Sequence, residues 1–574
     1  INMNNVFAGV VLPGLVQAGL LTMGQVAAIA PIFTTLNPTY FGTQTIHTSG
    51  YNENQLIDNK ASSMKVDVAL HYKPTEDSEI IFNSKIGQGN TMLHATNRNN
   101  LKNFGLQQHK IEYNNRNLNL RAYTSIENSG NTVDMSALGA VMVLAQPGGA
   151  GAWYAGYFGS YFGLDGIFSQ ISPNPVTALN AIIGSASAGQ SFSDLVPNDL
   201  PSHAAARKAA DQNLLKPGST AWNNALERAG KTGIDIFGGG AGILDTSKSN
   251  SFEVNYNLQD LVSIADVIIG GSFREYVLRS NGTLFTDYTA PISYDDIGIY
   301  AQAKKDLFGG ALKLTGSMRY DKSQFFDGHI TPRIGAILFL NENQNLRFSY
   351  QTGFQNPSAQ DQYIGLDISS AILMGMSSDN IDRFQMDVRG VSSTQMYNLT
   401  GNYIVNNSFT LASVQAGAPV LATGLKPVES MYVKSYDFGY RINGKKTAFD
   451  INAYLTEWDN FISATNYITP MYQAPGFGGG LALARGDFRV LNLRSNTDEI
   501  VRTYGVSLGF ETAMFKIYDV NLTAGYNKMK FDNPDSDYEA GFNTPQTRVK
   551  VSLGSTKLAK NFSFNVSAKY HDKF

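Results

Sequence analysis

Hydrophobic and polar residues alternate along much of the chain. In the run 64–72, Met64, Val66, Val68, Leu70 and Tyr72 fall on one side of an extended backbone, and Lys65, Asp67 and His71 on the other. A period of two places successive side chains on opposite faces of a β-strand. The pattern returns in 118–126, 312–320, 449–455, 506–510 and 562–570. We therefore predict many strands, each with one face on an apolar medium and one face on water.

The connections between these runs are of two kinds. Short polar turns at 114–117, 308–310 and 341–345 predict hairpins. Other connections are long, at 137–189, 190–250, 356–408 and 470–491. Short turns on one rim and long loops on the other are typical of outer-membrane barrels, whereas compact soluble domains rarely hold unstructured loops beyond roughly a dozen residues. We expect an all-β fold, in which 1–63 is a loop and helical approach and 64–574 is a large antiparallel transmembrane β-barrel with long extracellular loops.

One insertion within 190–250 has a helical pattern. The alanine-rich run 203–210 predicts a helix, and after Pro217-Gly218 a second short helix is expected over 220–229. Ser202 and Thr220 are the expected N-caps. We place this helical pair in an extracellular loop, because about thirty residues cannot bury a core of their own.

Composition agrees with a barrel. The mean hydropathy is −0.17 and no stretch approaches the roughly 18 apolar residues of a transmembrane helix. A barrel strand puts only every second residue on lipid, which keeps the average hydropathy mild. Tyr (29) and Phe (33) far exceed Trp (3), and this supply of rings suits the aromatic girdles of a barrel.

Charge and cysteine content narrow the function further. The net charge of −3 offers no basic surface for nucleic acid, which is therefore not an expected partner. The chain has no cysteine, so disulfides, thiolate nucleophiles and Cys-bound metals are excluded. It begins at Ile1 without a recognisable signal peptide, and we expect either that a signal was removed upstream or that the chain is a fragment.

Candidate chemistry is sparse. The seven histidines form no HExxH or closely spaced ligand pair, and the SxxK match at 62–65 opens a strand, where the Ser and Lys side chains diverge. The acidic stretch 532–539 offers Asp532, Asp535 and Asp537 to a calcium ion, yet the EF-hand spacing is absent and an ordinary solvated turn is the favoured interpretation. We expect no catalytic residues, no enzyme activity and no other cofactor, and the ligand-binding residues stay unknown.

A longer motif supports a specific family. Residues 346–363 read LRFSYQTGFQNPSAQDQY, which resembles the LRxSYxTGFRNPTxQDQY strand and loop of TonB-dependent transporters. The subgroup it resembles contains glycan and peptide importers with an N-terminal carboxypeptidase-regulatory-like domain. The family usually has Arg where this chain has Gln355. The motif residues are Gly353, Phe354, Asn356, Pro357, Gln360 and Tyr363.

Further segments extend the resemblance over most of the chain, from about residue 51 to the end. Residues 315–323 and 331–333 are similar to the family's GSxRYDKS…TPR hairpin. Residues 425–441 resemble LKPE…YExGYR, with Val428 where Glu is expected. From this stretch the motif residues are Lys426, Pro427, Gly439 and Tyr440.

The resemblance implies location, partners and mechanism. It implies a 22-stranded barrel in the bacterial outer membrane for the intact protein, in contact with outer-membrane lipids. It further implies a plug domain that this chain lacks, through which the TonB complex would act to import an extracellular nutrient. A lid lipoprotein or another outer-membrane subunit is an expected partner. Phe574 imitates a terminal aromatic, yet similar proteins continue with further strands, so we expect an incomplete barrel.

Two alternatives remain open. The barrel could be a structural subunit of a larger outer-membrane complex, which copurification and the absence of any growth defect would indicate. It could also be a passive porin, which high conductance of the full-length protein in planar bilayers would indicate.

Overall fold

The computed structural model describes residues 2–94, 97–163, 165–235, 238–368, 370–390, 395–515, 517–531 and 544–573. The chain divides into two compact units. The helical unit comprises Ile1–Ala61, Thr91–Leu101 and Asn131–Ile243. The sheet unit comprises Ser62–Asn90, Lys102–Gly130 and Leu244–Phe574.

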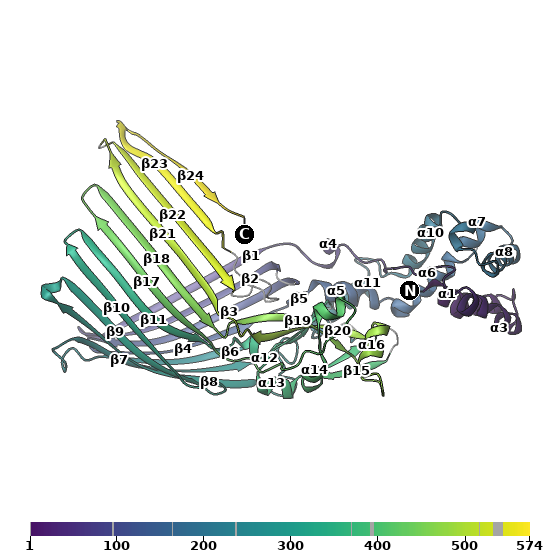
Figure 1. The fold of residues 1–574 in the computed structure, drawn as a ribbon, viewed down its shortest axis with the longest axis horizontal. Helices are drawn as coiled ribbons and strands as arrows, with labels where there is room; N and C mark the ends of the chain where they lie inside the picture. Colours follow the sequence, from purple (N-terminus) through teal and green to yellow (C-terminus); the bar gives the residue numbers. More distant parts are fainter. Residues whose placement is uncertain are drawn as a thin grey trace. The chain divides into compact units, whose positions relative to one another are not determined.

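The long strands of a 17-stranded sheet build the sheet unit (Figure 1). Successive long strands pair with one another, and their ladders run antiparallel, as in β10 with β11 and β17 with β18. The all-β prediction and the large antiparallel sheet are confirmed. The strands are β1 Ser62–Thr75, β2 Ser78–His94, β3 Arg98–Asn115, β4 Leu118–Asn128, β6 Lys248–Asn257, β7 Asp266–Leu278, β8 Ile292–Leu307, β9 Leu312–Ser323, β10 His329–Asn341, β11 Gln344–Gln355, β17 Met431–Asn443, β18 Thr447–Asp459, β21 Val501–Met514, β22 Tyr518–Phe531, β23 Thr547–Ala559 and β24 Phe562–His571.

Each alternating run of the sequence lies within one of these strands. One face of the sheet presents large apolar side chains to the outside: Ile330, Ile334 and Leu338 of β10 are exposed, as is Phe348 of β11. An exposed apolar band of this size is what the hydrocarbon of a bilayer would cover. β1 and β24 form the two edges, and no ladder joins them within the described residues.

The two rims of the sheet differ as the sequence indicated. At one rim β8 and β9 are joined by 308–311, and β10 and β11 by 342–343. In the first of these turns Gly309 and Gly310 have φ of 67° and 93°, in the left-handed region that glycine tolerates best. At the other rim the sheet unit has its long connections, among them 356–430 and 460–500.

These two long connections fold together into a small second sheet, with strand order β12-β13-β20-β19-β16. Its strands are β12 Gly365–Asp367, β13 Ile372–Met374, β16 Phe409–Thr410, β19 Ile462–Pro470 and β20 Phe488–Asn496. Short helices accompany it, namely α12 Ala359–Tyr363, α13 Ser378–Arg383, α14 Gly401–Asn407, α15 Leu411–Gln415 and α16 Gly480–Arg485. The buried side chains of Ile372, Met374, Leu399, Leu491 and Leu493 form its core. Apart from β19 and β20, these segments are too short to carry a detectable period, so the sequence did not predict them.

The helical unit contains more helix than the sequence predicted. Its helices are α1 Met3–Val6, α2 Leu12–Gln17, α3 Met23–Pro31, α4 Glu53–Leu56, α5 Met135–Leu144, α6 Gly149–Tyr161, α7 Ile167–Ile171, α8 Pro175–Ser187, α9 Phe192–Leu195, α10 Leu200–Ala210 and α11 Thr220–Lys231. The helical pair does not bury a core by itself: α10 and α11 contribute to two apolar clusters that other segments largely build. The pair joins helices from 137–189 and from the N-terminal segment, and the combined length is enough to bury a core.

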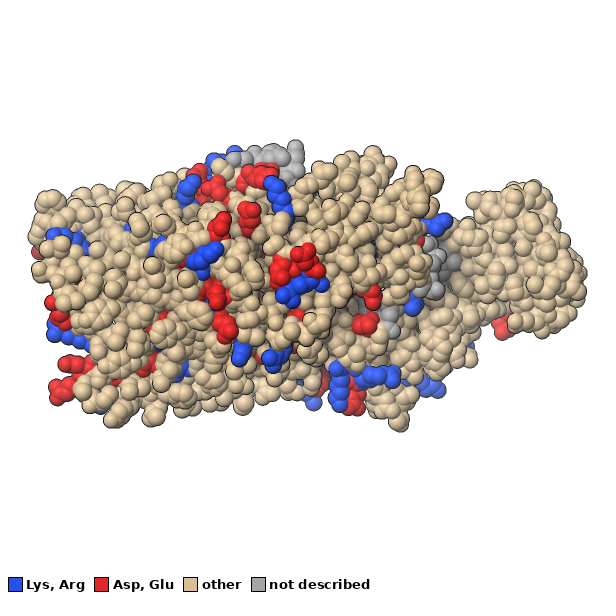
Figure 2. Space-filling model, turned by 90° about the horizontal axis from the view of Figure 1, so that it is seen from below, with Lys and Arg blue, Asp and Glu red and all other residues tan. Residues whose placement is uncertain are grey.

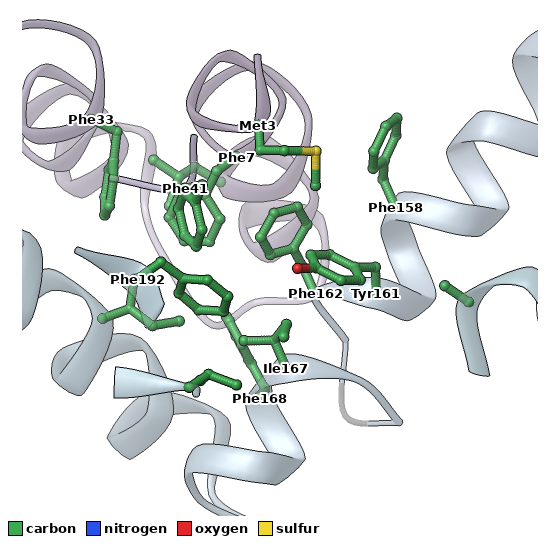
Figure 3. Close-up of a cluster of buried hydrophobic side chains, with 14 of the residues drawn as sticks. Met3, Phe7, Phe33, Phe41, Phe158, Tyr161, Phe162, Ile167, Phe168 and Phe192 are labelled. Atoms are coloured by element: carbon green, nitrogen blue, oxygen red, sulfur yellow. The ribbon is translucent and has the colours of Figure 1, made fainter. Parts of the chain in front are cut away.

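Aromatic residues dominate this core (Figure 3). Met3, Phe7, Phe33 and Phe41 come from the N-terminal segment and meet Phe162, Ile167, Phe168 and Phe192. The ring of Phe7 lies 4.8 Å from that of Phe33 and 5.3 Å from that of Phe162, and the rings of Phe41 and Phe192 are 4.9 Å apart. Contacts between rings at such distances stabilise a core beyond the area they bury.

The N-terminal segment of the same unit carries no charge. Residues 1–52 contain no Lys, Arg, Asp or Glu. On the face seen in Figure 2, the part of the helical unit around α3 and α8 shows few charged side chains. None of the described helices is long and apolar enough to cross a membrane.

Both predicted helices, over 203–210 and 220–229, are confirmed as α10 and α11, but their caps were wrong. Ser202 is buried inside α10, where its Oγ accepts a hydrogen bond from Gln170 Nε2 at 2.5 Å. Asp199 occupies the N-cap position, yet its carboxylate accepts from Tyr161 Oη at 2.7 Å and pairs with His203 at 3.2 Å. The partners Gln170 and Tyr161 lie more than thirty residues away and cannot be read from local sequence.

Helix α11 is capped by Ser219, whose Oγ accepts from the backbone N–H of Trp222 at 3.2 Å, so Thr220 is its first helical residue. We expect Ser219→Ala to destabilise the helical unit by about 1 kcal/mol, because the N–H loses its acceptor. Thr220→Ala should change stability by less than half as much. Thermal unfolding of the two variants distinguishes them, and equal effects would contradict the assignment of the cap.

Candidate functional site

The family motif lies at the rim with the long connections, where β11 ends. Gly353 lies two residues before the end of β11. A Cβ at this position would lie 3.0 Å from Cγ1 of Val433 on β17. The side chain of Asn356 follows, and its Oδ1 accepts a hydrogen bond from Ser430 Oγ at 2.7 Å. Because Ser430 directly precedes β17, this bond joins the end of β11 to the start of the neighbouring strand.

A short helix continues the motif. Ser358 and Asp361 form a capping box at α12, with Ser358 N–H donating to Asp361 Oδ2 at 2.9 Å and Asp361 N–H to Ser358 Oγ at 3.2 Å. The Gln362 side chain donates from Nε2 to the carbonyl oxygen of Pro357 at 2.7 Å. Gln360 is exposed, and its carbonyl oxygen accepts from the N–H of Ile364. These local bonds explain why the sequence turns here instead of continuing the strand.

Tyr363 anchors the motif. Its side chain is fully buried, and its ring lies 6.0 Å from that of Tyr294 and 6.4 Å from that of Phe325. The carbonyl oxygen of Tyr363 accepts from the N–H of Thr286 at 3.1 Å. Burial raises the pKa of the Tyr363 phenol, so it stays neutral at any physiological pH.

The connection between β7 and β8, residues 279–291, supplies the other half of this anchor. Asp287 is buried, and its carboxylate accepts from Ser280 N and Ser280 Oγ, both at 2.5 Å. It also accepts from the N–H groups of Asn281 and Gly282, each at 2.9 Å. The sequence pattern did not single out Asp287. The turn sequence Ser280-Asn281-Gly282 was the available signal, since such turns often bond to a nearby carboxylate.

The start of the motif lines a cavity of about 420 Å³. The 321–323 and 354–362 segments, which belong to two different family motifs, both line it. Aromatic rings and carboxylates face the cavity together, and the rings of Tyr276 and Tyr294 stack at 4.8 Å. Its lining residues are Tyr276, Tyr294, Asp296, Asp321, Lys322, Ser323, Phe354, Asn356, Pro357, Ser358, Ala359 and Gln362. A concave site with rings and a few polar groups is suited to hold a small ligand.

The motif in 425–441 has two parts: its first residues contact the core of the small sheet, and its last residues belong to strand β17 of the large sheet. Lys426 and Pro427 are exposed. Val428 is buried in the core of the small sheet, and its N–H donates to Met376 O at 2.7 Å, which explains why an apolar residue stands where Glu was expected. On the wall, Tyr440 Oη donates to Gln344 Oε1 at 3.0 Å.

Gly439 makes room for an ion pair. A Cβ at this position would lie 2.9 Å from Nε and Nη2 of Arg347, whose Nη2 donates to Asp450 at 2.8 Å. We expect Gly439→Ala to displace the guanidinium and destabilise the sheet unit by about 1–3 kcal/mol. Gly316→Ala on β9 is the control, because nothing lies within 4 Å of a Cβ there. Thermal unfolding and a crystal structure of each variant test this, and an unmoved Arg347 in Gly439→Ala would contradict it.

The calcium candidates Asp532, Asp535 and Asp537 lie outside the described residues. Within the described part of the chain, no group of three or more His, Asp or Glu could hold a metal ion. The calcium site therefore stays a prediction.

Comparison with known proteins matches the chain to one protein family. The model of the family described as "TonB dependent receptor-like, beta-barrel" matches residues 26–573. No curated protein sequence matches the chain.

Several solved structures are similar in fold. The siderophore receptor PirA from Pseudomonas aeruginosa has 10% identity and a TM-score of 0.41, over 89% of this chain and 67% of that protein. A mutant of the ferric enterobactin receptor PfeA from Pseudomonas aeruginosa has 12% identity and a TM-score of 0.49, over 92% of this chain and 60% of that protein. The FrpB iron transporter from Neisseria meningitidis has 10% identity and a TM-score of 0.46, over 89% of this chain and 59% of that protein.

The chain thus spans about three fifths to two thirds of the length of these receptors. The family match covers nearly the whole chain, and it agrees with the alternating strands, the unequal rims and the motif at the end of β11. The chain belongs to the TonB-dependent receptor-like β-barrel family and is a protein of the bacterial outer membrane.

Proposed function

We propose that this chain is the wall and the ligand-capturing rim of a TonB-dependent receptor that imports an extracellular nutrient. The lipid-facing side chains would hold the sheet in the membrane, and the long connections would bind the nutrient. The TonB complex would act through a plug domain. The observation that carries this proposal is the cavity of about 420 Å³, where two family motifs meet at the rim with the long connections.

The family consists of receptors and transporters, and we propose no catalytic residue for this chain. Membership of the subgroup with a carboxypeptidase-regulatory-like domain stays a prediction. A partner lid lipoprotein or a further outer-membrane subunit also stays a prediction. The nutrient itself is open, because the residues that line the rim fit several kinds of small molecule.

The test uses the intact protein in its own host. Deleting the gene should abolish growth on, or uptake of, at least one nutrient in a broad panel, and removing TonB should have the same effect. Absence of any defect would contradict import. Once the nutrient is known, Tyr276→Ala should weaken its binding about tenfold or more, because this ring lines the cavity. Tyr72→Ala is the control: it removes an exposed ring of β1 outside the cavity and should leave nutrient binding unchanged.

A further inference from the structure

A second cavity, of about 660 Å³, lies on the polar face of the sheet. Strands β8, β9, β10, β11, β17 and β18 contribute its lining. Four of the lining residues are cationic, Lys304, Lys313, Arg333 and Arg347, whereas only Asp437 and Asp450 are acidic.

Both acidic groups already have partners. Asp450 accepts two hydrogen bonds from Nη2 of Arg347, at 2.8 and 2.9 Å, and lies 3.9 Å from Arg441. Asp437 accepts from Ser349 Oγ at 3.2 Å. Asp450 is thus neutralised by Arg347, whereas Asp437 bonds to a neutral hydroxyl and leaves one negative charge against the remaining cations of the cavity.

The four cationic side chains have fewer ion-pair and hydrogen-bond partners. Arg333 and Lys304 are both exposed, and neither side chain forms an ion pair or a hydrogen bond with a described residue. Nε of Arg347 is buried and has no hydrogen-bond partner among the described residues. Lys313 reaches Asp306 at 3.7 Å, outside the cavity. The cavity therefore carries a surplus of positive charge and an unsatisfied donor.

Elsewhere on the same face of the sheet, positive and negative side chains pair with one another. On β3, β4 and β6, Glu112 pairs with Lys110 at 2.7 Å and with Arg121 at 3.4 Å, and Arg121 also pairs with Glu253 at 3.2 Å. Directly opposed residues of neighbouring strands have side chains on the same face of a sheet. Arg121 lies opposite Glu253, Glu253 opposite Ser272, and Ser272 opposite Gly298. Lys304 is six residues after Gly298 on β8, so it lies on the same face as Arg121 and Glu253. The positive surplus is a local property of the cavity.

We propose that this cavity binds an anionic group, a carboxylate or a phosphate. Arg333 offers a planar fork of donors that fits two oxygens of either group, and Lys304 adds a point charge. A concave surface with a surplus of one sign of charge concentrates counter-ions. Gly335 and Gly439 have no side chain to fill the space. The anion binding is independent of import; only the idea that a transported nutrient presents the anion rests on the proposed function.

Calorimetric titration of the intact protein in detergent, at low ionic strength, tests the proposal with inorganic phosphate and with citrate. Both should bind, while glucose, which is neutral, should not. Loss of one charge-assisted hydrogen bond should weaken phosphate binding about tenfold in Arg333→Gln, and the double variant with Lys304→Gln should show no binding. Arg333→Lys keeps the charge without the fork and should fall between Arg333→Gln and the unaltered protein.

Lys445→Gln is the matched control, because it removes the same charge from the β17–β18 turn outside the cavity. Absence of binding to both phosphate and citrate would overturn the proposal, as would binding that the double variant leaves unchanged. Nutrient uptake by the double variant, measured separately, shows whether the cargo carries the anion. If phosphate binds and no nutrient is imported, the site stands and the proposed import fails.

Discussion

Asp287→Ala is expected to release the connection between β7 and β8, at a cost of about 4 kcal/mol or more. The substitution removes the acceptor of four hydrogen bonds, from three backbone N–H groups and the Ser280 hydroxyl. Each donor left without a partner in a buried site costs about 1–3 kcal/mol. The connection also holds Tyr363 through Thr286, so the loss should spread to the motif.

Hydrogen exchange followed by mass spectrometry measures this effect locally. The amides of 280–288 should exchange at least roughly a hundredfold faster in Asp287→Ala, because the connection opens more often. Asp260→Ala is the control: Asp260 lies in the exposed turn between β6 and β7, where it meets Arg116 at 3.1 Å. Such exposed pairs contribute little. Unchanged exchange in Asp287→Ala would show that the carboxylate does not hold the connection.

Tyr363→Ala should destabilise the rim by about 3–5 kcal/mol, the usual range when a buried ring is removed from a core. The Tyr363 side chain is completely buried, in a cluster with Leu278, Phe285, Ile292 and Tyr294. The expected result is that a protease added outside cells cleaves within 356–430 in the variant and spares the unaltered receptor. Tyr570→Ala, which removes an exposed ring of β24, should leave the pattern unchanged. Equal resistance of Tyr363→Ala and the unaltered protein would contradict an anchoring role.

The strands could be predicted because a half-buried strand repeats every second residue, and the sequence displays that period directly. The turn at Gly309 and Gly310 was predictable for a similar reason, since its residues are those the backbone requires there. The motif over 346–363 indicated the rim because it is long and contiguous. Each of these signals is local in the sequence.

What the sequence missed depends on contacts between distant residues. Helix α6 is apolar on most of its surface, and Gly156 approaches Cα of Ala210 on α10 closely, so that a Cβ at 156 would lie 3.6 Å away. The exposed face of α6 carries Gly151, Ala155 and Gly159 in place of polar residues, so the sequence shows no amphipathic period and does not reveal the helix. The 420 Å³ cavity joins residues of β7, β8, β9 and the 354–362 segment, and only the register of the sheet brings them together.

The most direct test of the membrane wall uses β18, taking advantage of a chain without cysteine. Single cysteines at each position from 449 to 456, carrying a nitroxide spin label, are compared in the intact protein in lipid bilayers. Labels at Phe449, Ile451, Ala453 and Leu455 should collide mainly with oxygen, which concentrates in lipid. Labels at Asp450, Asn452, Tyr454 and Thr456 should be shielded from lipid and favour a water-soluble nickel chelate. Accessibility without this alternation, or with the opposite phase, would contradict the account.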